Sequence, residues 1–223
     1  MAFLSDCRPA TKQSGSRRNF ARRVGVAFLW LRGVAFASVA TIALFQSSAV
    51  AQRAPSKEEI EAAFLYNFAK FVEWPTNAFA TASSPIVIGV LGNKDFAAIV
   101  DKTVRTSQPV NGRTFKVESY ESSTEIHSGR ECHILFINCN TGGTSSEAKR
   151  EMERLRKIIT SLEGKSILTV SEDPGNEFAK LGGIVNFYTE NQKIRFQINP
   201  DAAKAANLKI SSKLLNLAQI VRS

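Results

Sequence analysis

Three side chains that bind soft metal ions lie close together in the chain. Cys132 and His133 are adjacent, and six residues separate Cys132 from Cys139. Common zinc sites place their paired ligands about two to four residues apart, so this spacing with one histidine matches no common pattern. The second histidine of the sequence, His127, lies in a polar stretch. We therefore expect no metal site.

A second group, Ser171, Glu172 and Asp173, carries a hydroxyl and two carboxylates directly after an apolar run. Such groups can act in catalysis, but acidic residues after a strand are most often solvated loop residues. Neither histidine is near them in sequence, and the chain has no G-x-S-x-G nucleophile turn. We predict no catalytic residue, no cofactor and no enzymatic activity.

The segment 139–144 (CNTGGT) leads from a predicted strand into a predicted helix. The first turn of a helix can bind an anion on its backbone N–H groups. The segment lacks the lysine of a phosphate-binding loop and the spacing of a dinucleotide fingerprint. We interpret it as a glycine turn that ends at Thr144, the N-cap of the next helix.

The elements that would position these groups alternate between strand and helix. Near-continuous apolar runs predict buried strands, and helical spacing of apolar residues predicts helices between them. The order predicts an α/β fold: a mostly parallel sheet flanked by helices on both faces, with a C-terminal antiparallel hairpin at the sheet edge and terminal helices. The predicted strands are 85–91, 113–120, 133–138, 166–170, 184–189 and 193–198, and the later helices are 95–104, 145–162, 201–206 and 213–221.

The first predicted helix belongs to an aromatic stretch, Ala62–Pro75. Ser56 and Glu59 form a capping-box pattern at its start, and Pro75 predicts its end after about residue 73. The predicted inner stripe consists of Ile60, Phe64, Phe68 and Phe71, with Asn67 as the polar member of the same arc.

Two interpretations of the aromatic residues stay open. They form the core face of a helix, or some of them face a partner, as exposed aromatics at interfaces do. The candidates for partner contact are Tyr66, Phe71 and Trp74.

Most of the net charge of +9 lies at the N-terminus, because residues 1–51 hold seven Lys and Arg residues and one acidic residue. The remainder is weakly basic, with no pattern for nucleic-acid binding. Paired arginines, an apolar run at 33–45 and the tripeptide Ala49–Ala51 indicate an export signal cut after Ala51. Secretory export, twin-arginine export and an uncleaved anchor stay open. We predict a signal peptide at 1–51 and one periplasmic domain at 52–223.

A disulfide between Cys132 and Cys139 also stays open. The residues between them, HILFIN, predict a strand. If that strand is straight, the two cysteines lie roughly 23 Å apart, whereas a disulfide needs Cα atoms within about 7 Å. An intrachain bond therefore requires the chain to fold back before Cys139.

Several motifs occur together and in order along the chain, and in this arrangement the sequence resembles the YfiR family of periplasmic regulators. The motifs are AAFLYNFAKFVEWP at 62–75, IGVLGNKDF at 88–96, CHILFIN at 132–138, ILTVSE at 167–172, FAKLGGIVNF at 178–187, IRFQIN at 194–199 and LKISSKLLNLA at 208–218.

This resemblance implies a non-enzymatic domain that binds the periplasmic part of an inner-membrane diguanylate cyclase and holds it inactive. It also implies a link to cyclic-di-GMP and biofilm, with other membrane sensors, such as a sensor kinase, as further partners, and a homodimer. Family members often carry a cysteine in the first strand that reaches the cysteine before HILFI; here that position is Gly89. The alternative is a periplasmic small-ligand-binding module that uses the strand-end loops.

Overall fold

The computed structural model describes residues 53–127, 132–139, 144–175 and 177–222. From Ala54 onward the chain forms one compact unit. The predicted export signal, its cut after Ala51 and part of the 139–144 loop lie outside the described residues.

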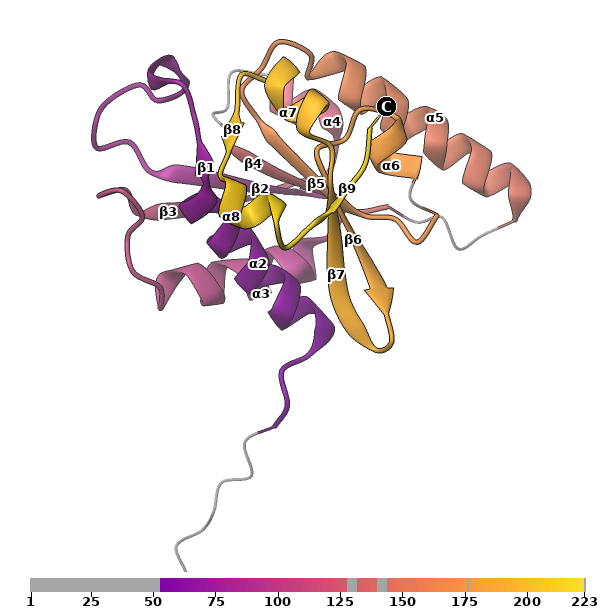
Figure 1. The fold of residues 1–223 in the computed structure, drawn as a ribbon, viewed down its shortest axis with the longest axis horizontal. Helices are drawn as coiled ribbons and strands as arrows, with labels where there is room; N and C mark the ends of the chain where they lie inside the picture. Colours follow the sequence, from indigo (N-terminus) through magenta and orange to yellow (C-terminus); the bar gives the residue numbers. More distant parts are fainter. Residues whose placement is uncertain (1–52, 128–131, 140–143, 176, 223) are drawn as a thin grey trace, which may run out of the picture. The chain divides into compact units, whose positions relative to one another are not determined.

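A seven-stranded sheet forms the centre of this unit (Figure 1). Neighbouring strands run parallel except for the antiparallel pair β6–β7, which confirms the predicted fold class and hairpin. In sheet order the strands are β3 (Phe115–Tyr120), β2 (Ile86–Leu91), β4 (Ile134–Ile137), β5 (Leu168–Glu172), β6 (Val185–Glu190), β7 (Lys193–Ile198) and β9 (Gln219–Ile220).

Helices cover both faces of the sheet, so each face has its own apolar core (Figure 1). One core contains buried residues of α2, α3, α7 and α8, and the other contains buried residues of α4, α5 and α6. β2 and β4 are buried along their whole length, as their uninterrupted apolar sequences predict. The helices are α2 (Lys57–Phe71), α3 (Lys94–Arg105), α4 (Ser123–His127), α5 (Ser145–Ser161), α6 (Glu177–Lys180), α7 (Pro200–Ala205) and α8 (Ser212–Leu215).

The aromatic helix α2 begins as predicted. The Ser56 hydroxyl accepts from the Glu59 N–H, and the Glu59 carboxylate accepts from the Ser56 N–H, which completes the capping box. The helix ends at Phe71, two residues earlier than predicted, because Val72 and Glu73 form strand β1. β1 pairs with β8 (Lys209–Ile210) in a separate antiparallel sheet that the sequence did not predict.

The buried face of α2 is rotated relative to the predicted stripe. Phe68 is fully buried as expected, but Ile60, Phe64 and Phe71 are only partly buried, and Asn67 accepts from the Lys70 ammonium near the surface. The cause is that α2 packs against α3 as well as against the sheet, so a different arc faces inward. The buried residues of α2 are Glu61, Ala62, Leu65, Phe68 and Ala69.

Four phenylalanine rings join α2 to the hairpin strands. The rings of Phe64 and Phe68 each lie 5.4 Å from the ring of Phe196, measured between centroids. Their distances to the ring of Phe187 are 5.8 and 5.7 Å. Aromatic pairs at such distances stabilise a fold beyond the area that they bury.

The predicted length of the last helix, 213–221, is wrong. α8 ends at Leu215, and Gln219 and Ile220 form β9, which pairs with Gln197 and Ile198 of β7. Without β9, β7 would be an edge strand with unpaired backbone N–H and C=O groups, and β9 pairs with these groups. β7 is therefore not the sheet edge. Leu217, which falls within the predicted helix, is 69% exposed.

The burial of Phe68 and the exposure of Leu217 predict mutational effects of very different size. Phe68→Ala should lower the free energy of unfolding by about 3 to 5 kcal/mol, because it leaves a cavity in the aromatic cluster. Leu217→Ala should change it by less than about 0.5 kcal/mol, because the side chain is exposed. Urea denaturation measures both, and a large loss for Leu217→Ala would contradict the exposure of this side chain.

Candidate functional site

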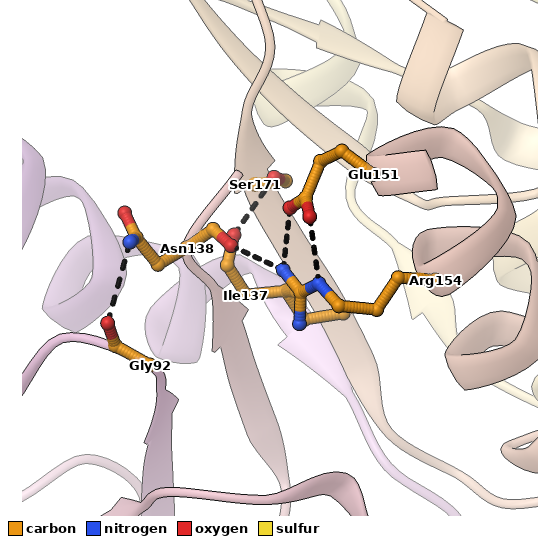
Figure 2. Close-up of polar contacts among 6 residues, drawn as sticks. All are labelled: Gly92, Ile137, Asn138, Glu151, Arg154 and Ser171. Carbon is orange, nitrogen blue, oxygen red and sulfur yellow. Dashed lines mark hydrogen bonds and ion pairs between the residues drawn. The ribbon is translucent and has the colours of Figure 1, made fainter. Parts of the chain in front are cut away.

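The sheet order places a topological switch point between β2 and β4. The chain passes from β2 to β3 on one side and then returns to β4 on the other side of β2. Ligands of open α/β sheets bind beyond the carboxyl ends of the strands at such a point. Figure 2 shows the residues found there: Gly92, Ile137, Asn138, Glu151, Arg154 and Ser171.

Asn138 spans the switch point with its side chain. Its Nδ2 donates to the Gly92 carbonyl at 3.3 Å (Figure 2). Its backbone N–H donates to the Leu91 carbonyl at 3.0 Å. Asn93, the next residue after Gly92, uses its side-chain oxygen to cap α3 by accepting from the Phe96 N–H. The amides that could recognise a ligand here are therefore bonded to the protein's own backbone.

Arg154 of α5 holds the end of β4 from the other side. Its Nη2 donates to the Asn138 carbonyl at 2.7 Å, and its Nε and Nη2 donate to the two carboxylate oxygens of Glu151 at 2.9 and 2.6 Å (Figure 2). The hydrogen bonds to Glu151 raise the pKa of Arg154. The guanidinium is thus a permanently charged clamp between α5 and the strand end.

The acidic strand-end group that the sequence singled out has structural contacts. The Ser171 hydroxyl donates to the Ile137 carbonyl at 2.8 Å. Asp173 is fully buried, and its carboxylate accepts from the N–H groups of Gly175, Glu177 and Phe178 around the start of α6. These contacts position the loop after β5.

His133 is buried at the opposite end of β4. Its Nδ1 accepts from the Val87 N–H at 3.0 Å, so the ring is neutral and its Nε2 carries the hydrogen that is donated to the Ala78 carbonyl. The ring stacks on Phe79 with 4.3 Å between centroids. In the described part of the chain, no cluster of three or more His, Cys, Asp and Glu side chains is arranged to hold a metal ion.

Cys132 and Cys139 are thiols and form no disulfide in the structure. They lie on either side of β4, which stays extended between them. Burial raises the pKa of Cys132 to about 12, and its thiol donates to the Ile134 carbonyl. A Cβ atom on Gly89 would lie 2.9 Å from the Cys132 sulfur and 2.5 Å from the Tyr120 ring. Residues 89 and 132 are therefore neighbours, and the Tyr120 ring leaves no room for a side chain at position 89.

The three candidate partner-binding residues are each partly exposed. Tyr66 packs edge-on against Phe115 and donates its hydroxyl hydrogen to the Gln108 carbonyl. Trp74 donates from its indole N–H to the His133 carbonyl. Phe115 and His133 lie where β3 and β4 begin, so Tyr66 and Trp74 mark the end of the sheet opposite the switch point.

Sequence reasoning missed three functional candidates. Asn138 and Arg154 meet only through the fold, since they are 16 positions apart in the sequence. Glu61 is almost fully buried, with only 3% of its surface exposed. Its one sequence signal is an acidic residue directly before the aromatic stretch.

Together, these features define an α/β domain with helices on both faces of its sheet. The polar side chains at its switch point bond to the protein itself, and its candidate partner-binding residues are partly exposed aromatics. A family model described as YfiR/HmsC-like matches residues 58–219, so the chain belongs to the YfiR/HmsC-like family, as the motifs indicated. This is a family of periplasmic regulators. A comparison with curated proteins finds no match. None of the described helices is long and apolar enough to cross a membrane.

The Arg154 clamp predicts a loss of stability on truncation. Arg154→Ala should lower the free energy of unfolding by about 1 to 3 kcal/mol, because the Asn138 carbonyl and Glu151 lose a charged donor. Arg156→Ala, an exposed position on the same helix, should change it by less than about 0.5 kcal/mol. Equal effects in urea denaturation would contradict a specific role of the clamp.

The thiols predict a two-step alkylation pattern. In the chain from residue 52 onward, both cysteines should react with maleimide after unfolding without reductant. In the folded protein at pH 8, Cys132 should resist iodoacetamide because its buried thiol is almost wholly protonated. Mass spectrometry after alkylation distinguishes the sites, and failure of both cysteines to react in the unfolded, unreduced protein would reveal a disulfide.

Proposed function

We propose that this protein is a periplasmic repressor that binds the periplasmic part of a membrane-bound signalling protein, a diguanylate cyclase in the first place and a sensor kinase otherwise. The observation that carries this proposal is the family match, which covers residues 58–219 and thus nearly the whole described domain. Residues 1–51 act as a signal peptide cut after Ala51, and the domain from residue 52 acts as a homodimer.

The contact surface that we propose contains Tyr66, Phe71 and Trp74. Aromatic side chains with one buried side and one exposed side are typical anchors of protein interfaces, because they bury a large area at low entropic cost. Two of the three are already held by hydrogen bonds, Tyr66 to Gln108 and Trp74 to His133. Such pre-ordering lowers the entropy lost on binding.

A small-ligand-binding module is the second candidate. The observation that favours it is a cavity of about 460 Å³, within the size range of ligand pockets, between the end of α5 and α7. It lies away from the strand-end loops that suggested a ligand in the sequence. Apolar side chains in its wall include Ile159, Leu162, Ile167, Leu181, Ile184 and Ala202.

Capture from detergent-solubilised membranes tests the proposed contact. The tagged wild-type protein should recover an inner-membrane protein with a periplasmic domain and a cyclase or kinase domain. Trp74→Ala should reduce that recovery at least about tenfold, as hot-spot truncation does. Leu217→Ala removes an exposed apolar side chain that is not one of the three proposed contact residues, and it should leave recovery unchanged.

Thermal melts of the two variants confirm that each is folded at the capture temperature. Equal recovery by wild type and a folded Trp74→Ala variant would contradict the proposed surface. Recovery of no such membrane protein, together with a metabolite that raises the melting temperature, would favour the ligand-binding module.

A further inference from the structure

One carboxylate in the described domain is buried without a full set of partners. Glu61 is 3% exposed, and its Oε1 atom has no hydrogen-bond partner. It lies in the second turn of α2, on the face that packs inward next to Ala62. A buried charged carboxylate with an unsatisfied oxygen is costly, whereas a protonated carboxyl costs far less.

The charged groups around Glu61 increase this cost. Glu172, at the end of β5, places a negative charge near Glu61. Glu58, which lies on α2 with Glu61, adds a second negative charge. Lys57 is the nearby cation, but it forms an ion pair with Glu172. Burial first and Glu172 second raise the pKa of Glu61 to about 7, with a smaller opposing effect of Lys57.

We propose that Glu61 is a pH sensor that keeps the first turns of α2 packed against the end of β5 when it is protonated and loosens that contact when it ionises. The ion pair between Lys57 and Glu172 joins the same two elements, so the sensor acts where α2 is fastened to the sheet. Ionised Glu61 repels Glu172 and competes with it for Lys57. The inference does not depend on the proposed function.

The sign of the effect follows from proton binding. Glu61 has an ordinary pKa of 4.5 in the unfolded chain and a pKa of about 7 in the folded protein. Between these values the folded state holds a proton that the unfolded state has lost, so stability is greatest at low pH and falls as pH rises toward 7. This direction is opposite to that of a salt-bridged carboxylate, whose stability is lost in acid.

The size of the effect is measurable. From these two pKa values, the folding equilibrium constant should fall on the order of 30-fold between pH 5.5 and pH 8 because of this group alone. Above pH 8 the contribution is constant, because both states are then ionised.

The test compares pH profiles of unfolding for wild type and Glu61→Gln. Glutamine has nearly the same shape and no charge, so the 30-fold fall should vanish and the variant should be more stable than wild type at pH 8. Glu153→Gln, an exposed position on α5, should keep the wild-type profile. Glu172→Gln should shift the fall to lower pH, because it removes the neighbouring charge and releases Lys57.

Hydrogen exchange localises the response. In wild type, the protection factors of the α2 amides at residues 60–65 should decrease more from pH 6 to pH 8 than those of α5, because α5 responds only through global unfolding; in Glu61→Gln both decreases should vanish. A Glu61→Gln profile that parallels wild type would overturn the proposal. So would a response that is the same in α2 and α5.

Discussion

The packing of α2 across the sheet is the interaction on which the rest of the domain depends. Its centre is the contact of Phe64 and Phe68 with the hairpin rings Phe187 and Phe196. Because Lys57 meets the end of β5 and Trp74 meets the start of β4, the helix segment runs antiparallel to the parallel strands. It therefore connects the two ends of the sheet.

These two ends have different chemistry. At the carboxyl ends of the strands, Asn138, Arg154, Ser171 and Asp173 all bond to backbone or to neighbouring side chains. At the amino ends, partly exposed aromatic side chains lie beside the separate β1–β8 pair. The aromatic side chains are the surface that we propose for partner contact in this member of the YfiR/HmsC-like family.

Local signals in the sequence were reliable because the interactions they reflect are local. The capping box at Ser56, the cap at Thr144 and the hairpin of β6 and β7 occur as predicted. Each depends on residues within a few positions of one another.

Features set by distant segments could not be read in this way. Which face of α2 is buried depends on the position of α3. β9 forms in place of a longer helix because it pairs with β7, which lies far from it in the sequence. The carboxylate of Glu61 meets Glu172 only after folding. In the site, the clamp of Arg154 on Asn138 likewise depends on how α5 docks beside β4.

The most direct test of the proposed repression is the cellular level of cyclic-di-GMP after deletion of the gene. If the protein holds a diguanylate cyclase inactive, deletion should raise that level severalfold, and expression of the exported wild-type chain should restore it. An unchanged level in the deletion strain, under conditions where the protein is present in the parent strain, would contradict the account.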